Sequence, residues 1–367
     1  MQPFEGATIG GIALRNRIVR SATWEGMCDD SGVPTERLLS CYEALAEGGV
    51  GLIIGGYAYV SPEGKQNFGK MGMYADSLVP ALEGLTRRVH DKGGKIAAQL
   101  VHAGGQANRN VSGHPPVAPS AVSLPFYREV PAALDRAGIA RIVADFARAA
   151  ARAKQAGFDG VQLHCAHGYL LGQFLSPLTN ARRDEYGGCL ENRARILVET
   201  ARAVRNAVGK EFPVWIKING DDFVPGGMTA EEAASVARFL EAEGIDAIEV
   251  SGGTPASGDR TPARTAVDSA GKEGYHRGLA RGIKRQVRIP VGAVGGFRSL
   301  SVIEDTLRTG DADFVSLSRP LIREPGLVKR WTSGDRRKAA CISCNGCFRP
   351  ALRGNGIRCI HAGNTTE

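Results

Sequence analysis

Residues 157–169 read Gly-Phe-Asp-Gly-Val-Gln-Leu-His-Cys-Ala-His-Gly-Tyr. The run up to the first histidine has the short, apolar character of a buried strand, and a turn is expected at the last glycine. Two imidazoles and a phenol, at His164, His167 and Tyr169, therefore follow a strand directly. One isolated histidine is usually a satisfied core residue, whereas three such groups form a cluster of hydrogen-bond donors. This cluster suits the binding of an anionic or carbonyl oxygen.

That strand is one of eight short β-rich segments that alternate with amphipathic helical stretches. The strands are expected at residues 17–21, 50–55, 95–101, 158–164, 214–218, 247–251, 290–294 and 314–318. Helices are expected between most of them, for example at 75–92, 139–156, 191–208 and 229–243. Eight βα units in one chain predict an α/β fold of the closed (β/α)8 TIM-barrel type. No Gly-x-Gly-x-x-Gly follows the first strand, so an open sheet with a Rossmann nicotinamide site is not supported.

Three segments depart from a plain barrel. Residues 8–14, with two glycines at their centre, predict an N-terminal hairpin that could close the barrel floor. Residues 102–137 are rich in Pro, Gly and Ser and are too long for an ordinary connection, so we expect a functional lid there. Residues 336–367 are expected to form a short Cys-rich C-terminal extension, packed on a barrel that spans residues 1–335.

Composition and charge argue against several classes of protein. The 367-residue chain has a formal net charge of +8, but its arginines are spread along helical segments and no nucleic-acid motif is present. No apolar run is long enough to span a bilayer, and the first residues lack the basic and apolar parts of a signal peptide. We therefore expect a cytoplasmic protein without a nucleic-acid or membrane partner. A homo-oligomer is compatible with these features.

The other strand ends carry polar residues that suggest a ligand. In barrels of this type the chemistry lies at the C-terminal ends of the strands. The last two strands are followed by Gly295, Gly296, Ser318 and Arg319. Glycine N–H groups and an arginine at this position suit a phosphate group, the alternative being tight turns with an incidental arginine.

Two further residues lie between this site and the histidine cluster. Gln99 and Lys217 fall at the ends of inner strands, and together with the two outer sites they suggest an elongated phosphorylated cofactor across the barrel mouth. Lys217 would place a cation beside an electron-rich ring and stabilise its negative charge on two-electron reduction. The alternative is an ordinary inward lysine paired with a carboxylate.

Longer motifs in this chain resemble those of the old yellow enzyme family of FMN-dependent oxidoreductases, over nearly the whole length. The matching segments are residues 14–19 (Leu-Arg-Asn-Arg-Ile-Val), 61–64 (Ser-Pro-Glu-Gly), 99–105 (Gln-Leu-Val-His-Ala-Gly-Gly), 164–180 and 182–193. The last two, which begin His-Cys-Ala-His-Gly-Tyr and Arg-Arg-Asp-Glu-Tyr-Gly-Gly, are highly specific.

The resemblance implies a barrel that holds FMN without a covalent bond, is reduced by NADH or NADPH, and reduces an activated C=C bond of a small-molecule substrate. His164 and His167 resemble the pair that binds the substrate's electron-withdrawing oxygen, and Tyr169 resembles the proton donor to the α-carbon. Gln99 and Lys217 match flavin contacts, and the glycine and arginine site matches the phosphate contacts. Further flavin-lining positions correspond to Ser21, Ala22, Thr23 and Gly56.

The chain also departs from the family pattern. Trp24 stands where relatives have a Thr or Cys that tunes the flavin potential, and Lys217 stands where many relatives have Arg. Residues 251–254, Ser-Gly-Gly-Thr, are not followed by the His-Glu-Ala-Arg of the dienoyl-CoA reductase branch, which weakens a fatty-acyl substrate.

Four of the eight cysteines are clustered near the end of the chain. They are Cys341, Cys344, Cys347 and Cys359. Four thiolates at this spacing could hold a [4Fe-4S] cluster or a zinc ion, or could be free thiols. The spacing resembles the cluster motif of the trimethylamine dehydrogenase and dienoyl-CoA reductase branch. Because the sequence ends at Glu367, we expect no second flavin domain, so a cluster would exchange electrons with a separate electron-transfer protein.

Three other functions are alternatives to an FMN-dependent ene-reductase. The first is an iron–sulfur-linked amine or enoyl-CoA dehydrogenase. The second is a flavin-binding barrel without turnover, which has no need of a proton donor such as Tyr169. The third is a metallohydrolase with His164 and His167 as ligands, for which no third ligand is evident at a neighbouring strand end.

Overall fold

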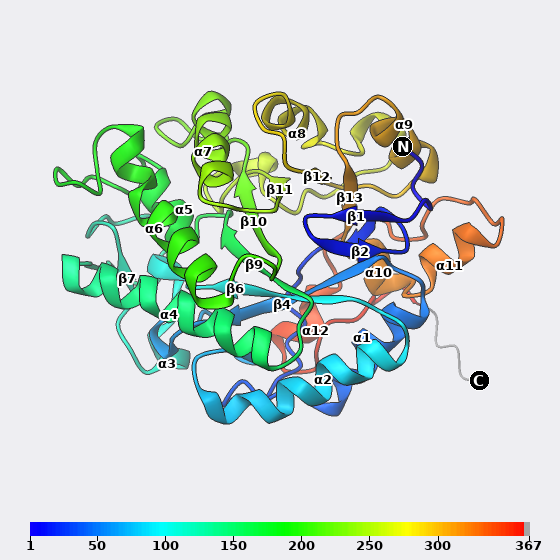
Figure 1. The fold of residues 1–367 in the computed structure, drawn as a ribbon, viewed down its shortest axis with the longest axis horizontal. Helices are drawn as coiled ribbons and strands as arrows, with labels where there is room; N and C mark the ends of the chain where they lie inside the picture. The colour runs from blue at the N-terminus through cyan, green and yellow to red at the C-terminus, as the bar shows by residue number, and fades with distance from the viewer. Residues whose placement is uncertain (363–367) are drawn as a thin grey trace.

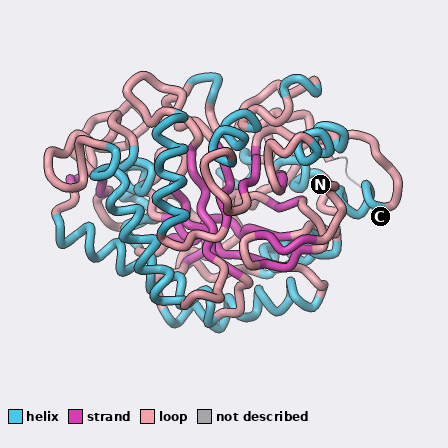
Figure 2. Tube along the Cα trace, turned by 45° about the horizontal axis from the view of Figure 1, so that its top comes forward, coloured by secondary structure: helices cyan, strands magenta, loops and turns pink. Residues whose placement is uncertain are grey.

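The computed structural model describes residues 1–362, and within them eight parallel strands close into a barrel. The barrel strands are β3 (Ile18–Arg20), β4 (Leu52–Tyr59), β6 (Ile96–Val101), β9 (Gly160–Cys165), β10 (Val214–Asn219), β11 (Ala247–Ser251), β12 (Val291–Val294) and β13 (Phe314–Leu317). They pair in chain order, and β3 pairs with both β13 and β4, which closes the sheet. The strands lie at the centre and helices surround them (Figure 2). The predicted (β/α)8 fold is confirmed.

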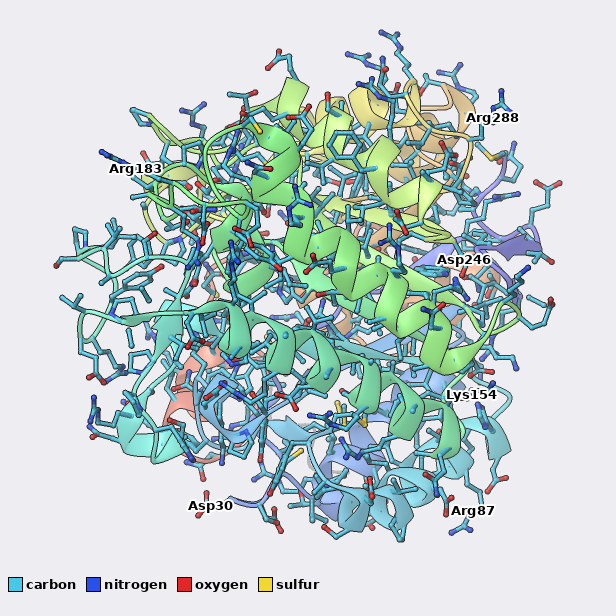
Figure 3. The ribbon with its side chains drawn as sticks, turned by 60° about the vertical axis from the view of Figure 1, so that its left-hand side comes forward. Asp30, Arg87, Lys154, Arg183, Asp246 and Arg288 are labelled. Atoms are coloured by element: carbon cyan, nitrogen blue, oxygen red, sulfur yellow. The ribbon has the colours of Figure 1, made fainter. Side chains whose placement is uncertain are left out.

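The helices surround this barrel, as Figure 1 shows, and most of them contribute buried apolar side chains to its core cluster. Their bounds are α1 (Glu36–Glu47), α2 (Val79–Asp91), α3 (Arg109–Ser112), α4 (Arg136–Gln155), α5 (Leu170–Leu175), α6 (Leu190–Val208), α7 (Ala230–Ala242), α8 (Arg277–Lys284), α9 (Leu300–Arg308), α10 (Arg319–Arg323), α11 (Leu327–Thr332) and α12 (Phe348–Leu352). Helix α4 begins where Asp135 accepts a hydrogen bond from the N–H of Gly138, and α7 begins with a capping box between Thr229 and Glu232. Lys154, labelled near the end of α4 in Figure 3, donates to the carbonyl of Val208 at the end of α6 (2.7 Å).

One observed strand extends well beyond its predicted end, whereas the ends of the others differ by at most two residues. Strand β4 continues past residue 55 to Tyr59, and its pairing with β6 shifts register between Gly55 and Ala58. Such a bulge lets a strand continue through two adjacent glycines while it redirects a side chain. As a result Tyr57, which follows the predicted strand at residues 50–55, lies inside the observed strand and borders the central cavity.

The predicted hairpin is confirmed and closes the floor of the barrel. Strands β1 (Ala7–Ile9) and β2 (Ile12–Leu14) pair antiparallel, and their apolar side chains pack under the barrel in a cluster that includes Trp215. The carbonyl of Gly10 accepts a hydrogen bond from Trp215 Nε1 (3.0 Å). Gly10 has φ of 49°, and a Cβ there would lie 2.4 Å from the indole nitrogen, so this turn requires glycine.

The predicted lid segment and the C-terminal extension contain only short elements. Within residues 102–137 lie a 3₁₀ turn (η3, Gly104–Gln106), α3, and two paired two-residue strands, β7 (Val117–Ala118) and β8 (Ala132–Ala133). The described part of the extension crosses the barrel mouth. The N–H of Ala339 donates to the carbonyl of Arg298 (2.8 Å), and that of Ile357 to Glu25 (2.6 Å).

The exposed arginines Arg87, Arg183 and Arg288 lie at separate edges of the molecule (Figure 3). Among the helices of residues 1–362, none combines the length and the apolar character needed to cross a bilayer.

Candidate active site

A cavity of about 430 Å³ lies at the carboxyl ends of the barrel strands, where the sequence placed the chemistry. Most of the predicted site residues border it. These are Ser21, Ala22, Thr23, Gln99, His164, His167, Tyr169, Lys217, Gly296, Ser318 and Arg319. Gly56 instead faces the Glu25 side chain, with which a Cβ would collide, and Gly295 packs on Tyr275. Of the predicted lid, only Gln106 is among the described residues that border the cavity.

The histidine and tyrosine cluster forms one end of this cavity. The ring centroids of His164 and His167 are 5.1 Å apart, and those of His164 and Tyr169 are 4.9 Å apart. His164 Nδ1 accepts the N–H of Ala166 (3.2 Å), which leaves the proton of the neutral ring on Nε2. The imidazole is therefore fixed as a donor through Nε2.

His167 is held in a strained conformation by two neighbouring strands. Its φ is 59°, a left-handed value that non-glycine residues adopt at a cost of roughly 1–3 kcal/mol. Its N–H donates to Asn219 Oδ1 (3.1 Å), and its Nε2 lies 2.7 Å from Ser251 Oγ. Asn219 ends β10 and Ser251 ends β11, so the barrel register itself fixes the ring. Backbone strain of this kind is concentrated at functional sites.

Burial sets the protonation states of the three groups. It lowers the pKa of His164 well below its ordinary value, and the Lys217 cation acts in the same direction. Burial also lowers the pKa of His167 well below its ordinary value, with His164 as the next cause. For Tyr169 burial raises the pKa to about 12. At neutral pH the site thus presents two neutral imidazoles and a protonated phenol.

Gln66, which the sequence did not indicate, connects the phenol to its surroundings. Its Oε1 accepts hydrogen bonds from the hydroxyls of Tyr57 and Tyr169, both at 3.0 Å, and from Lys70 Nζ at 3.2 Å. Its Nε2 donates to Gln106 Oε1 (3.3 Å). Because Gln66 and Lys70 lie in a loop without hydrophobic periodicity, no sequence pattern points to them.

A buried polar chain runs through the middle of the barrel. Gln99 Nε2 donates to Gln162 Oε1 (2.8 Å), and Gln162 Nε2 donates to Glu249 Oε2 (3.0 Å). The same carboxylate oxygen lies 3.3 Å from Lys217 Nζ, which also donates to Ser21 Oγ (2.8 Å). Lys217 is thus paired with a carboxylate, the alternative that the sequence left open. The charged Glu249 in the middle of an apolar strand was the available signal for this partner.

The opposite end of the cavity is cationic. Arg319, at the start of α10, donates to the carbonyl of Arg264 (2.8 Å) and to Asn345 Oδ1 (2.7 Å). Arg298 and Ser316 also border the cavity there, although the sequence did not single them out. Arg298 Nε and Ser316 Oγ are buried and have no hydrogen-bond partner within the described chain. Such groups indicate a missing anionic or polar ligand.

These features fit FMN as the bound group. Cationic and unpartnered donors at one end suit its phosphate. In the middle, the Gln99 amide nitrogen is bonded to Gln162, so its carbonyl oxygen remains to accept from a ring N–H. The histidine and tyrosine end remains for a substrate beside the ring.

The four clustered cysteines do not form a comparable site. Cys341 and Cys347 are buried, Cys344 is exposed, and Arg323 lies 3.7 Å from Cys359 Sγ. Burial, followed by the neighbouring Cys341, raises the pKa of Cys347 to about 11. Within residues 1–362, no three His, Cys, Asp or Glu side chains are grouped to hold a metal ion. The donor chemistry suits a metal centre, but the side-chain arrangement does not.

Comparison with other proteins identifies related chains. A metal reductase of Desulforamulus reducens is 39% identical over 359 residues, which cover 97% of this chain and 53% of the relative. An NADPH dehydrogenase of Clostridium acetobutylicum is 36% identical over 329 residues, covering 89% of this chain and 94% of the relative. This chain therefore spans about half the length of the first relative and nearly the whole of the second.

Several solved structures have a similar fold. The complex of 2-naphthoyl-CoA reductase with 2-naphthoyl-CoA superposes with a TM-score of 0.90 at 28% identity, covering 98% of this chain and 56% of that one. The old yellow enzyme homologue of Zymomonas mobilis gives 0.80 at 30% identity, covering 94% and 96%. Histamine dehydrogenase of Rhizobium sp. 4-9 gives 0.86 at 27% identity, covering 97% and 51%.

The sequence profile of one family extends across almost all of the barrel. It matches residues 2–338 and stops just before the first of the clustered cysteines. The chain belongs to the NADH:flavin oxidoreductase / NADH oxidase family, whose members are oxidoreductases.

Proposed function

We propose that this protein is an FMN-dependent oxidoreductase that takes hydride from NADH or NADPH and reduces the activated C=C bond of an α,β-unsaturated carbonyl-type substrate. The observation that carries the proposal is the grouping of His164, His167 and Tyr169 at one end of a cavity whose other end suits a phosphate. The cavity residues would hold FMN, and the chemistry that the bound group would supply is hydride transfer from the nicotinamide to the β-carbon of the substrate.

The two imidazoles bind the substrate oxygen. His164 presents Nε2–H as its donor because Nδ1 accepts from Ala166, and His167 is held beside it by Asn219 and Ser251. Negative charge grows on the substrate oxygen as hydride reaches the β-carbon. Donors fixed in advance stabilise that charge without reorganisation in the transition state.

Tyr169 completes the reaction by giving its proton to the α-carbon. Its hydroxyl stays protonated at neutral pH because burial raises its pKa to about 12. A weakly acidic phenol suits a carbanion-like acceptor, and general-acid catalysis of this kind contributes about 10²- to 10⁴-fold. The bond to Gln66 Oε1 holds the phenol in place until the substrate arrives.

Isotopic labelling of the product tests this proposal. With a nicotinamide that carries deuterium at its transferable position, we expect one deuterium at the β-carbon of 2-cyclohexenone. In D₂O with unlabelled nicotinamide we expect one deuterium at the α-carbon. Absence of saturated ketone, or label at the carbonyl carbon, would overturn the proposal.

A second candidate is a dehydrogenase or reductase that exchanges electrons with a separate protein through the Cys-rich extension. The observation in its favour is that Ser343 and Phe348, which lie among the cysteines, border the cavity. Histamine dehydrogenase and 2-naphthoyl-CoA reductase, to which the chain is similar, are named for amine and acyl-CoA substrates. Stoichiometric iron and sulfide in protein purified without oxygen would favour this candidate, and their absence would remove it.

A further inference from the structure

Lys70 is a buried cation at the substrate end of the cavity. It lies between a 3₁₀ turn (η1, Pro62–Gly64) and the short strand β5 (Met71–Gly72), and only 3% of its surface is exposed. Its Nζ is 3.1 Å from the centre of the Tyr57 ring and 5.5 Å from that of Trp24. Aromatic faces stabilise a cation, so these two rings hold the ammonium at the cavity wall.

One shared acceptor places Lys70 beside the phenol of the proposed proton donor. Lys70 Nζ and Tyr169 Oη both donate to Gln66 Oε1, at 3.2 and 3.0 Å. Lys70 also lowers the pKa of His164, as one of its lesser causes. The ammonium is therefore close to the proposed position of a substrate held by His164 and protonated by Tyr169.

The charges around the cavity leave Lys70 without an anion. Four cations border the cavity, and no aspartate or glutamate does so among the residues that the structure describes. The cations are Lys70, Lys217, Arg298 and Arg319. Glu249 pairs with Lys217, and the two arginines lie at the proposed phosphate end. Of the four cations, Lys70 is therefore the one that has neither a paired carboxylate nor a place at the proposed phosphate end, among the residues that the structure describes.

The buried carboxyl of Glu25 does not fill this role. It acts on Lys70 from a distance, but within residues 1–362 it is Arg20 that pairs with Glu25, at 3.5 Å. Burial also raises the pKa of Glu25 to about 7, so its negative charge is incomplete at neutral pH. Burial lowers the pKa of Lys70 well below its ordinary value, because the free amine is favoured where no anion is paired with it, and a carboxylate bound beside Nζ would favour the charged form.

We infer that Lys70 is a specificity-determining residue that selects electron-poor alkenes carrying a carboxylate and disfavours cationic amines. This inference rests on the proposed function, since it takes His164 and Tyr169 to mark the position of the substrate. A carboxylate beside Lys70 supplies the missing counter-ion and makes a charge-assisted hydrogen bond. A cationic ligand adds a like charge in a site from which water is largely excluded.

Two phenols, one with a carboxylate and one with the corresponding neutral methyl ester, provide the test. Both 4-hydroxybenzoate and its methyl ester offer a phenol to the histidine pair, but only the acid offers a carboxylate to Lys70. Calorimetric titration of the FMN-loaded protein is expected to show the acid binding about 10- to 100-fold more tightly, the range for a hydrogen bond to a charged group. Lys70→Met should abolish this preference, and Lys70→Arg, which keeps the charge, should retain it.

A cationic phenol tests whether Lys70 also disfavours a positive charge. In the wild type, 4-hydroxybenzylamine should bind more weakly than 4-hydroxybenzyl alcohol, and Lys70→Met should narrow that difference. Equal affinity of the wild type for the acid and the ester would overturn the inference, and that comparison needs no variant to fold. Loss of acid and ester affinity in equal proportion in Lys70→Met would also overturn it.

Failure of the inference differs from failure of the proposed function. If wild-type protein reduces 2-cyclohexenone but shows no preference for the acid, the charge selection is wrong and the reaction stands. If the acid preference depends on Lys70 but no enone is reduced, the selection stands and the reaction is wrong.

Discussion

The segment after β9 and the segment after α11 both carry dense runs of chemically active side chains, and the fold arranges them differently. Between His164 and Tyr169 the rings lie about 5 Å apart, and neighbouring strands hold them with hydrogen bonds. Between Cys341 and Cys359 no three thiols are grouped for a metal ion within the described chain. A barrel strand fixes the direction of the residues that follow it, whereas a loop segment depends on its own contacts.

The largest effect is expected from the phenol in the first segment. Tyr169→Phe should slow reduction of an enone by about 10²- to 10⁴-fold, the usual contribution of a general acid. It should leave the reduction of bound flavin by NADPH nearly unchanged, because no proton from Tyr169 is needed in that step. Stopped-flow measurement of the two half-reactions without oxygen separates them.

Tyr57→Phe is the matched control for this change. The Tyr57 hydroxyl donates to the same Gln66 oxygen, and the two rings are 5.3 Å apart. A comparable loss of enone reduction in Tyr57→Phe, or equal slowing of both half-reactions in Tyr169→Phe, would show that Tyr169 has no special role as proton donor.

The second segment can be tested by the reactivity of its thiols. Cys344 is exposed, whereas Cys347 is buried and its pKa is raised to about 11. The thiolate is the reactive form, so the raised pKa of Cys347 leaves little thiolate there near neutral pH. Alkylation with N-ethylmaleimide, followed by mass spectrometry, should modify Cys344 well before Cys347. Equal protection of all four cysteines, together with bound iron or zinc, would show that they are gathered after all.

A third effect is expected at the histidine pair. His164→Ala should weaken binding of 4-hydroxybenzaldehyde, whose phenolate resembles the developing enolate, by roughly 10- to 100-fold because a hydrogen bond to a charged oxygen is lost. His90→Ala is a suitable control, since His90 lies at the surface on α2 and bonds to Asp159. The affinity can be followed by spectral titration, and an unchanged value for His164→Ala would remove the oxyanion assignment.

The smallest effect is expected from pH. The two histidines remain neutral above their lowered pKa values, and Tyr169 remains protonated below a pKa of about 12. Raising the pH from 6 to 9 should therefore change none of the three protonation states. These three groups should add no titration to single-turnover enone reduction over this range. Because the pKa of Glu25 is raised to about 7, a midpoint near 6.5 would mean that a histidine titrates during catalysis only if it persists in Glu25→Gln.

The sequence predicted the strand-borne part of the molecule well. The eight barrel strands, the floor hairpin and the positions of His164 and Lys217 follow from periodicity and strand ends, because a parallel barrel brings those ends together. The pairing of Glu249 could also have been predicted, because a charged residue inside an apolar strand requires a partner. Gln66 and Lys70 could not be found in this way, because their loop reaches the cavity through tertiary contacts alone.

The predicted lid also shows that sequence patterns do not reveal the tertiary contacts of a loop. A functional lid at residues 102–137 stays a prediction, and Gln106 is the residue of that segment that borders the cavity among the described residues. The loop after β11 contributes Pro255, Thr261 and Tyr275, and the extension contributes Ser343. Length and composition indicate that a loop is unusual, but they do not show which surface it covers.

The central claim is that the cavity holds FMN and passes its electrons to a C=C bond, and an anaerobic spectrum tests it most directly. Protein purified without oxygen and loaded with FMN should show flavin bands that bleach with NADPH and return when 2-cyclohexenone is added. Return of the bands with one equivalent of saturated ketone is the predicted result. A protein that does not take up FMN, or bands that stay bleached with every enone tried, would contradict the account.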